Sequence, residues 1–384
     1  MSRLIWTTAG ESHGRGLVGV LEGLPAGLAL DVARVDAELA RRWAGYGRGG
    51  RAKLEDDRVE LLAGLRAGKT LGSPLAFVIA NHDQTIESLP VPTNARPGHA
   101  DLAGCQKLLA RDPRAVLERA SARETAARVA LAGFARQLLE RFGIELFAHV
   151  VELGGVAARD GLFETLGAER GARRAASDFQ CLDADADAAA RAKVDEAKAA
   201  GDSLGGVFEV RVVGLPPGLG HYVSAPERLT ARLGGALFSI PAIKGVEFGL
   251  GFESSRLPGS AVHDAIVPAD PTRPPRFGRF ARATNRAGGL EGGLTTGEQL
   301  VVRAAMKPIP TLRKGLDTVD FATGEPVRAT YQRSDVTSVP AASVVGEAVV
   351  ALELARAFLD KFGGDTLAEV EASFEFWRRE AGRV

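Results

Sequence analysis

Short β-branched stretches alternate along this chain with helical segments, and the intervals between them are irregular. Helical spacing of apolar residues is clearest over 121–142, where Ser121 and Glu124 also match the Ser-x-x-Glu pattern of a capping box. Alternating strand patterns occur at 59–62, 75–79, 147–153, 207–213 and 299–306. Because these strands and helices follow no regular βαβ period, the pattern predicts an α+β fold.

No linker in the sequence is long or polar enough to require a domain boundary. The 384 residues, 45% of them hydrophobic, are therefore expected to form a single domain over 1–384. Lys plus Arg number 48, as do Asp plus Glu, so no overall charge favours nucleic acid or a membrane surface. The two cysteines, the lack of a signal-peptide pattern and the lack of an apolar stretch of ~20 residues predict a soluble, cytoplasmic protein.

A polar, glycine-flanked pentapeptide, Gly10-Glu11-Ser12-His13-Gly14, separates two apolar runs near the start of the chain. Its letters fit the G-x-S-x-G elbow that presents a serine nucleophile in hydrolases, and they also fit a histidine acid held between two strands. The hydrolase interpretation requires an acid and a histidine later in the chain and an HGGG-type oxyanion segment. No such segment occurs, which favours the histidine.

Two clusters of basic residues stand out in a chain of zero net charge. The first surrounds the glycine-rich loop 45–50 and contains Arg41, Arg42, Arg48, Arg51 and Lys53. It could wrap an anion with guanidinium groups, or it could be a surface loop. The second cluster, 94–136, contains eight Lys or Arg but only four acids, and basic residues flank the start of a helix. This arrangement predicts phosphate binding, although the same residues also cap the helix.

A third candidate site combines the glycine-rich loop 285–297 with the segment 307–311, Lys-Pro-Ile-Pro-Thr. Glycines leave little side-chain bulk, so a flat ring could rest on the backbone while Lys307 and Thr311 meet its phosphate. The loop is neither a Walker loop nor a Rossmann fingerprint. We expect no metal, because no Cys, Asp or Glu stands at metal-ligand spacing from His82, His149, His221 or His263.

Together these segments resemble one family, the chorismate synthases, in the family's order and over nearly the whole chain. The matching stretches are 10–14 (GESHG), 45–51 (GYGRGGR), 96–101 (RPGHAD), 118–129 (ERASARETAARV), 201–206 (GDSLGG), 244–247 (KGVE), 285–293, 307–311 (KPIPT) and 333–335 (RSD). The resemblance implies a β-α-β sandwich, with helices packed between antiparallel sheets, assembled as a homotetramer.

The resemblance also implies the chemistry. The chain would be a lyase that converts 5-enolpyruvylshikimate 3-phosphate to chorismate by anti-1,4-elimination of phosphate. Reduced FMN would be required without net redox change. The GYGRGGR and ERASARET forms are similar to the bacterial branch without its own flavin reductase. A separate reductase would therefore supply the reduced flavin from NADPH.

The same resemblance implies roles for individual residues. His13 would protonate the departing phosphate, His99 would keep the flavin in its protonation state, and Asp335 would assist proton transfer at flavin N5. Ser12 and Ser121 would orient the histidines. The residues lining the substrate phosphate and carboxylate sites would be Arg42, Arg48, Arg51 and Arg123. The FMN contacts would be Arg119, Ala120, Ser121, Ala242, Gly292, Lys307, Pro308, Ile309, Pro310, Thr311 and Arg333.

One alternative remains open at this point. A non-catalytic FMN- or nucleotide-binding protein would use the same glycine and arginine loops. It would leave the pair His13 and His99 without a function.

Overall fold

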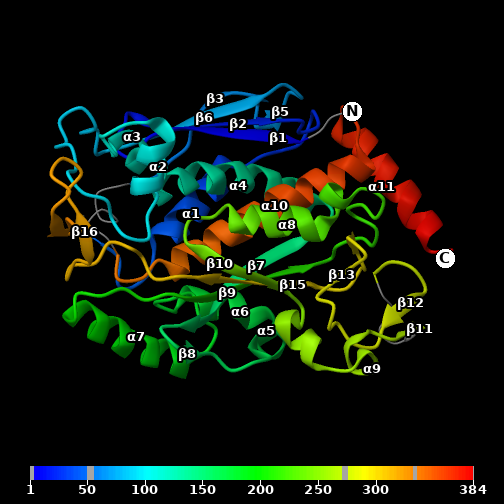
Figure 1. Ribbon diagram of the computed structural model, residues 1–384. Helices are drawn as coiled ribbons and strands as arrows, with labels where there is room; N and C mark the ends of the chain where they lie inside the picture. The colour runs from blue at the N-terminus through cyan, green and yellow to red at the C-terminus, as the bar shows by residue number, and fades with distance from the viewer. Residues whose placement is uncertain (1–3, 50–55, 270–275, 332–334, 384) are drawn as a thin grey trace.

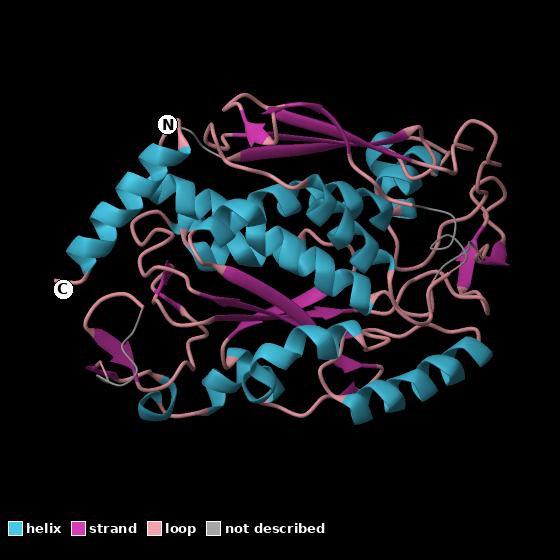
Figure 2. Cartoon of the chain, turned by 180° about the vertical axis from the view of Figure 1, so that it is seen from behind, coloured by secondary structure: helices cyan, strands magenta, loops and turns pink. Residues whose placement is uncertain are grey.

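The computed structural model describes residues 4–49, 56–269, 276–331 and 335–383, and it shows a layer of helices between two β-sheets (Figures 1 and 2). The first sheet has the strand order β1-β2-β6-β3 and the second β10-β15-β9-β7-β8. Neighbouring strands in both sheets are antiparallel. The expected α+β sandwich is therefore confirmed.

The strands of the first sheet are β1 (Ile5–Gly10), β2 (Gly16–Glu22), β3 (Glu60–Ala63) and β6 (Leu75–Ala80). Those of the second are β7 (Glu145–Leu153), β8 (Val156–Ala157), β9 (Gly206–Val213), β10 (Ile243–Phe248) and β15 (Leu300–Met306). Four two-stranded ribbons add β4 (Leu65–Arg66) with β5 (Lys69–Thr70), β11 (Ile266–Pro268) with β12 (Phe280–Arg282), β13 (Leu290–Glu291) with β14 (Leu294–Thr295), and β16 (Asp317–Val319) with β17 (Pro326–Arg328). The five predicted strands correspond to β3, β6, β7, β9 and β15.

The middle layer contains α1 (Val32–Trp43), α4 (Thr125–Arg141), α8 (Leu229–Phe238) and α10 (Val339–Phe362). In α10, 20 of 24 residues are buried, as expected for a helix that is apolar nearly all round. α4 packs on β2 and on α10, and α10 packs in turn on β7 and β9. These contacts join the two sheets through the helices.

The other helices lie outside this middle layer. α5 (Leu162–Leu166), α6 (Arg170–Ala175) and α7 (Ala184–Ala199) cover the outer side of the second sheet (Figures 1 and 2). The rest are α2 (Asp101–Leu108), α3 (Arg114–Arg119), α9 (Gly259–Val262), α11 (Leu367–Ala381) and the short 3-10 turns η2 (Ala122–Glu124), η3 (Gly167–Glu169), η4 (Ala225–Glu227) and η5 (Gly251–Arg256). Across the described ranges, no helix combines the length and apolarity needed to span a membrane.

The capping box predicted at Ser121 is wrong. Ser121 Oγ accepts a hydrogen bond from the backbone N–H of Arg123 at 3.3 Å and so caps η2 instead. The Glu124 carboxylate does not reach back to Ser121, because it accepts from Thr8 Oγ1 in β1 at 2.6 Å and from Arg128 Nε at 3.0 Å. The two side chains thus bond to other residues rather than forming the box, and α4 begins only at residue 125.

Candidate functional site

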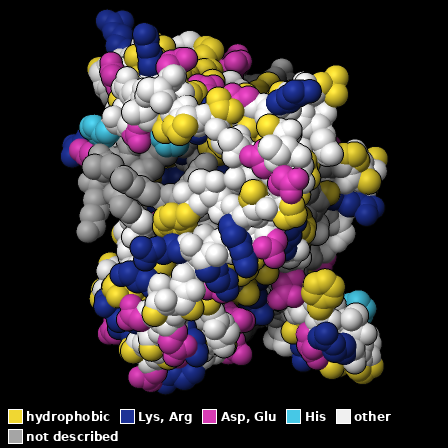
Figure 3. Space-filling view, turned by 60° about the vertical axis from the view of Figure 1, so that its left-hand side comes forward, with side chains coloured by type: hydrophobic (Ala, Val, Ile, Leu, Met, Phe, Trp, Pro, Cys, Tyr) yellow, Lys and Arg dark blue, Asp and Glu magenta, His cyan; other side chains and the backbone are white. Residues whose placement is uncertain are grey.

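Most of the predicted site residues meet at the end of the molecule that carries α2 and α3, on the left of Figure 1. The β1–β2 loop, the end of α1 and the start of α10 all reach this end: Tyr46 follows α1, and Gly45 lies against Pro340 in the first turn of α10. Figure 3 brings this end forward and shows histidine, basic and acidic side chains interspersed over it. The site is therefore built from segments far apart in the sequence.

His13 lies in the β1–β2 loop and is held by Glu118 at the end of α3. Its Nδ1 is 3.0 Å from Glu118 Oε1, and its backbone N–H donates to Oε2 at 2.7 Å. Its Nε2 lies 4.0 Å from Asp83 Oδ2, on the partly exposed side of the ring. Two carboxylates thus face this imidazole, an arrangement suited to a proton donor.

The structure is incompatible with a serine nucleophile elbow at Ser12. An elbow joins a strand to a helix, whereas the 10–14 loop joins two adjacent antiparallel strands. Gly10 has φ +106°, and a side chain there would meet the Gly16 carbonyl, so the hairpin geometry itself requires this glycine. Ser12 is buried, and its hydroxyl accepts from Ser121 Oγ at 3.1 Å.

His99 has a carboxylate partner of its own. Its Nδ1 lies 2.7 Å from Asp101 Oδ1 and 3.0 Å from Arg96 Nη2. Arg96 also pairs with both oxygens of Asp101, at 2.8 and 2.9 Å. Although burial opposes its ionisation, these hydrogen bonds from His99 and Arg96 keep the pKa of Asp101 well below its ordinary value. The carboxylate at His99 is therefore already neutralised by an arginine.

The His99 segment contacts the predicted flavin segment 307–311. Lys307 Nζ donates to the Gly98 carbonyl at 2.5 Å, and Arg96 Nη1 reaches Thr311 Oγ1 at 3.5 Å. Burial, together with the nearby Lys244, lowers the pKa of Lys307. Two ammonium groups in proximity favour an anionic ligand between them.

Three arginines predicted to bind substrate surround the ring of Trp43 at the end of α1. The guanidinium carbons of Arg42, Arg48 and Arg123 lie 4.9, 5.7 and 5.6 Å from the ring centroid. Asp57 binds Arg123 Nη1 at 2.6 Å and accepts from Trp43 Nε1 at 2.5 Å. This set, Arg42, Arg48 and Arg123 around Trp43, is called the arginine cluster below.

The arginine cluster carries more positive charge than its own carboxylates balance. Burial lowers the pKa of Arg42 to about 10, and the neighbouring Arg48 and Arg123 act in the same direction against Asp57. Arg42 Nη1 and Arg48 Nε are buried and form no hydrogen bond within the described part of the chain. Such guanidinium groups match the charge and geometry of phosphate and carboxylate.

Asn81 connects the arginine cluster to the His13 loop. Its side-chain oxygen accepts from Arg123 Nε at 2.9 Å, and its amide donates to the carbonyls of Glu11 and Gly14 at 3.0 and 2.8 Å. Because Asn81 is buried, these three hydrogen bonds fix the loop relative to Arg123.

The glycine-rich loop after α1 is anchored by the segment that precedes α10. Asp335 pairs with Arg48 Nη1 at 2.7 Å and accepts from Gly49 N at 2.6 Å and Ser338 Oγ at 2.8 Å. The Val336 N–H donates to the Gly47 carbonyl at 2.9 Å. These contacts favour the anion-binding interpretation of the loop over an unanchored surface loop.

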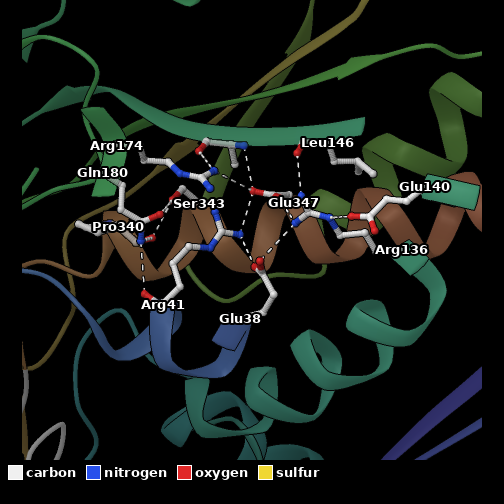
Figure 4. A network of polar contacts seen from close by, with 11 residues as sticks. Glu38, Arg41, Arg136, Glu140, Leu146, Arg174, Gln180, Pro340, Ser343 and Glu347 are labelled. Atoms are coloured by element: carbon white, nitrogen blue, oxygen red, sulfur yellow. Dashed lines mark hydrogen bonds and ion pairs between the residues drawn. The ribbon is translucent and has the colours of Figure 1, made fainter. Parts of the chain in front are cut away.

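A buried network of charged side chains around Glu347 fixes the position of α1 (Figure 4). Glu347 of α10 accepts from Arg41 Nη2 and from the Ala148 N–H of β7, both at 2.9 Å, and it also contacts Arg136 and Arg174. Burial would raise the pKa of Glu347, but the three arginines hold it well below its ordinary value of 4.5. Since Arg41 precedes Arg42, the network fixes the end of α1 from which the arginine cluster extends.

We expect Glu347→Gln to destabilise the protein by about 3–5 kcal/mol, because it removes the carboxylate that Arg41, Arg136 and Arg174 share and leaves the first two, among the residues described, only Glu38 and Glu140. The contribution of an acid with a lowered folded-state pKa is present above its ordinary pKa and lost as the pH falls. The difference between the urea-unfolding midpoints of the wild type and Glu347→Gln should therefore decrease as the pH falls from 5 toward 2. Glu371→Gln, at the exposed pair with Arg141, is the control and should cost under about 1 kcal/mol.

The remaining predicted flavin contacts are distributed unevenly. Arg119 holds β1 by donating to the Gly10 and Thr8 carbonyls, both at 3.0 Å, and Ala120 and Ser121 follow it. Ala242 has φ +69° and accepts from Lys307 N at 2.9 Å. Gly292 lies in the β13–β14 turn, beyond the Leu300 end of β15. Lys307 follows the opposite end of this strand, so the two residues do not meet within a single chain. Arg51 and Arg333 lie outside the described residues.

The predicted residues leave out several side chains on which this site depends. These are Trp43, Asp57, Asn81, Asp101 and Glu118. Asp101 and Glu118 stand inside the stretches 96–101 and 118–129. For Asp101 the available signal was an acid two residues from His99 in a basic segment, whereas Glu118 lies 105 residues from His13 and had no such signal. Asn81 and Asp57 gave no local signal, because their partners lie 42 and 66 residues away.

Comparison with known proteins agrees with the fold. The chorismate synthase family model matches residues 4–359. The chorismate synthase of Trichlorobacter lovleyi is 52% identical over 95% of this chain and 96% of its own, and that of Desulforamulus reducens is 50% identical over 99% and 100%. A crystal structure of a chorismate synthase superposes with a TM-score of 0.81 at 40% identity, covering 100% of this chain and 99% of the other.

The fold and the matches together define a carbon–oxygen lyase that removes phosphate. The chain belongs to the chorismate synthase family. Its reaction is the anti-1,4-elimination of phosphate from 5-enolpyruvylshikimate 3-phosphate, which gives chorismate. This reaction requires a reduced flavin without net redox change, and it ends the shikimate pathway to the aromatic amino acids.

Proposed function

We propose that the arginine cluster binds the anionic groups of 5-enolpyruvylshikimate 3-phosphate and that His13 protonates the phosphate as it leaves. The observation that carries this proposal is the link through Asn81 between the His13 loop and Arg123. Guanidinium groups hold the phosphate, and a histidine with carboxylates at both ring nitrogens supplies the proton. Arg51 belongs to the same proposed set.

We assign FMN as the flavin and the segment 307–311 as the site of its phosphate. Lys307 and the nearby Lys244 supply positive charge there, and the Thr311 hydroxyl of the same segment accepts from Arg96 Nη1 at 3.5 Å. A reduced FMN held by these residues would supply the electron that helps to expel the phosphate. In this assignment His99 maintains the protonation state of the flavin, Asp335 assists a proton transfer, and Ser12 and Ser121 support the histidine loop.

The other proposed flavin contacts are Arg119, Ala120, Ser121, Ala242, Gly292, Pro308, Ile309, Pro310 and Arg333. We further propose a cytoplasmic homotetramer that receives reduced FMN from a separate, NADPH-dependent reductase. Tyr222, Val223, Phe238 and Phe252 are large apolar side chains that are exposed in the single chain and that subunit contacts would cover. Sedimentation velocity tests the tetramer, and a monomer at micromolar concentration would contradict it.

An anaerobic assay tests the function. The purified chain is mixed with chemically reduced FMN and 5-enolpyruvylshikimate 3-phosphate, and phosphate and chorismate are measured together. We expect equal amounts of both products. Neither product should form with oxidised FMN, and no product with reduced FMN would refute the proposal.

A further inference from the structure

Glu118 ends the short helix α3 and contacts His13 through both the ring and the backbone. The residue is 1% exposed. Its Oε1 and Oε2 lie 3.0 and 3.1 Å from His13 Nδ1, and Oε2 also accepts from the His13 N–H at 2.7 Å. Arg114, one turn earlier on α3, donates to Oε1 at 3.3 Å and to the Pro90 carbonyl at 2.5 Å. One carboxylate thus fixes both the position and the rotation of the imidazole.

The contacts of Glu118 determine which ring nitrogen carries a proton. Burial alone would raise the pKa of Glu118, but hydrogen bonds from His13 bring it below its ordinary value, so the group is ionised near neutrality. An ionised carboxylate only accepts hydrogen bonds, and Nδ1 must therefore be protonated. Proton transfer is then assigned to Nε2, which faces the partly exposed side of the ring 4.0 Å from Asp83 Oδ2.

We infer that Glu118 is the positioning residue of His13, holding it in the Nδ1–H form and directing Nε2 toward the leaving phosphate. The identity of that phosphate rests on the proposed function, whereas the tautomer does not. When the imidazolium gives its Nε2 proton to the phosphate, the ring becomes neutral and keeps its Nδ1–H bond to Glu118. The phosphate gains the proton that His13 releases.

The surroundings of His99 differ from those of His13 at the ring itself. Glu118 and Asp101 each pair with an arginine, but the Arg96 guanidinium also lies 3.0 Å from His99 Nδ1. A guanidinium at that distance opposes a second positive charge on the ring. At His13 a second carboxylate, Asp83, faces the other nitrogen. Carboxylates therefore face both ring nitrogens of His13, whereas a guanidinium contacts Nδ1 of His99.

The test is a double-mutant cycle of Glu118→Gln and His13→Ala in the anaerobic assay. Glu118→Gln should lower kcat about 10- to 1,000-fold and leave KM within about twofold, because an amide donates to Nδ1 and favours the wrong tautomer. In the His13→Ala background the same change should alter kcat less than about twofold. Glu124→Gln is the matched control, since this buried carboxylate on the same segment bonds Thr8 and Arg128.

Losses that multiply in the double variant would mean that Glu118 does not act through His13. An equal loss in Glu124→Gln would assign the effect to general packing. Either result would overturn the inference. If Glu118→Gln does not fold, Glu118→Asp replaces it. This variant keeps the charge one methylene shorter, and its kcat should fall between those of the wild type and His13→Ala.

A second readout does not need turnover. In magic-angle-spinning NMR of sedimented, [15N]histidine-labelled protein at pH 9, the His13 signal is identified by its loss in His13→Ala. We expect the proton on Nδ1 in the wild type and on Nε2 in Glu118→Gln. An Nε2–H ring in the wild type would refute the inference even if chorismate forms. If the wild type makes no chorismate but shows Nδ1–H, only the proposed function fails.

Discussion

Replacing His13 with alanine should reduce kcat by about 10²- to 10⁴-fold, the usual contribution of a general acid. In the elimination a phosphate leaves a site rich in arginine. Among the residues described, His13 is the histidine of this site with a carboxylate near each ring nitrogen. Flavin affinity should be unchanged, because the Lys307 region is held by the separate segment around His99. Steady-state kinetics and a flavin-binding titration measure the two quantities.

The control for His13→Ala is His263→Ala, an exposed histidine outside the site. It should keep wild-type kcat. A His13→Ala enzyme with kcat within about threefold of the wild type would exclude general-acid catalysis by this residue. Loss of flavin binding in parallel with activity would favour a structural role. Turnover that collapses while flavin binding survives would exclude the non-catalytic flavin-binding alternative.

The fold could be predicted from the sequence wherever a segment is long and periodic. The helix expected over 121–142 corresponds to η2 followed by α4, and the strand expected at 75–79 differs from β6 by one residue. The short helices α2 and α3 were not predicted, because eight and six residues do not span enough turns for an apolar face to be recognised. These two helices carry Asp101 and Glu118, the partners of both histidines.

The candidate site could be predicted in part, for a related physical reason. Histidines and arginines stand out by residue type, so the sequence could propose His13, His99 and the three arginines that the structure gathers around Trp43. Apart from Asp101, their partners are ordinary acids and amides whose importance comes from long-range contacts, such as the one across 105 residues between His13 and Glu118. Gly292 is the opposite case. A motif shared with the family assigns it to the flavin contacts, but within one chain it lies at the end of β15 away from Lys307.

The arginine cluster leads to the second large effect, which concerns substrate affinity. We expect Arg48→Ala to raise the KM for 5-enolpyruvylshikimate 3-phosphate about 10- to 150-fold, since a hydrogen bond to a charged group contributes about 1.5–3 kcal/mol. Arg48 is the suitable position, because its Nε is buried and makes no hydrogen bond to any residue described, while Gly49 and Ser338 still hold Asp335 after the change. The fold should therefore tolerate the substitution.

Arg48→Lys should recover only part of the lost affinity, because an ammonium keeps the charge but lacks the planar fork that pairs with two oxygens. The matched control is Arg191→Ala. Arg191 stacks 3.9 Å from the ring of Tyr46 in the same loop, but it pairs with Asp178 on the surface rather than with the arginine cluster. It should leave KM within about twofold. If Arg191→Ala raised KM as much as Arg48→Ala, the effect would come from the conformation of the loop, and direct contact between Arg48 and the substrate would be ruled out as its cause.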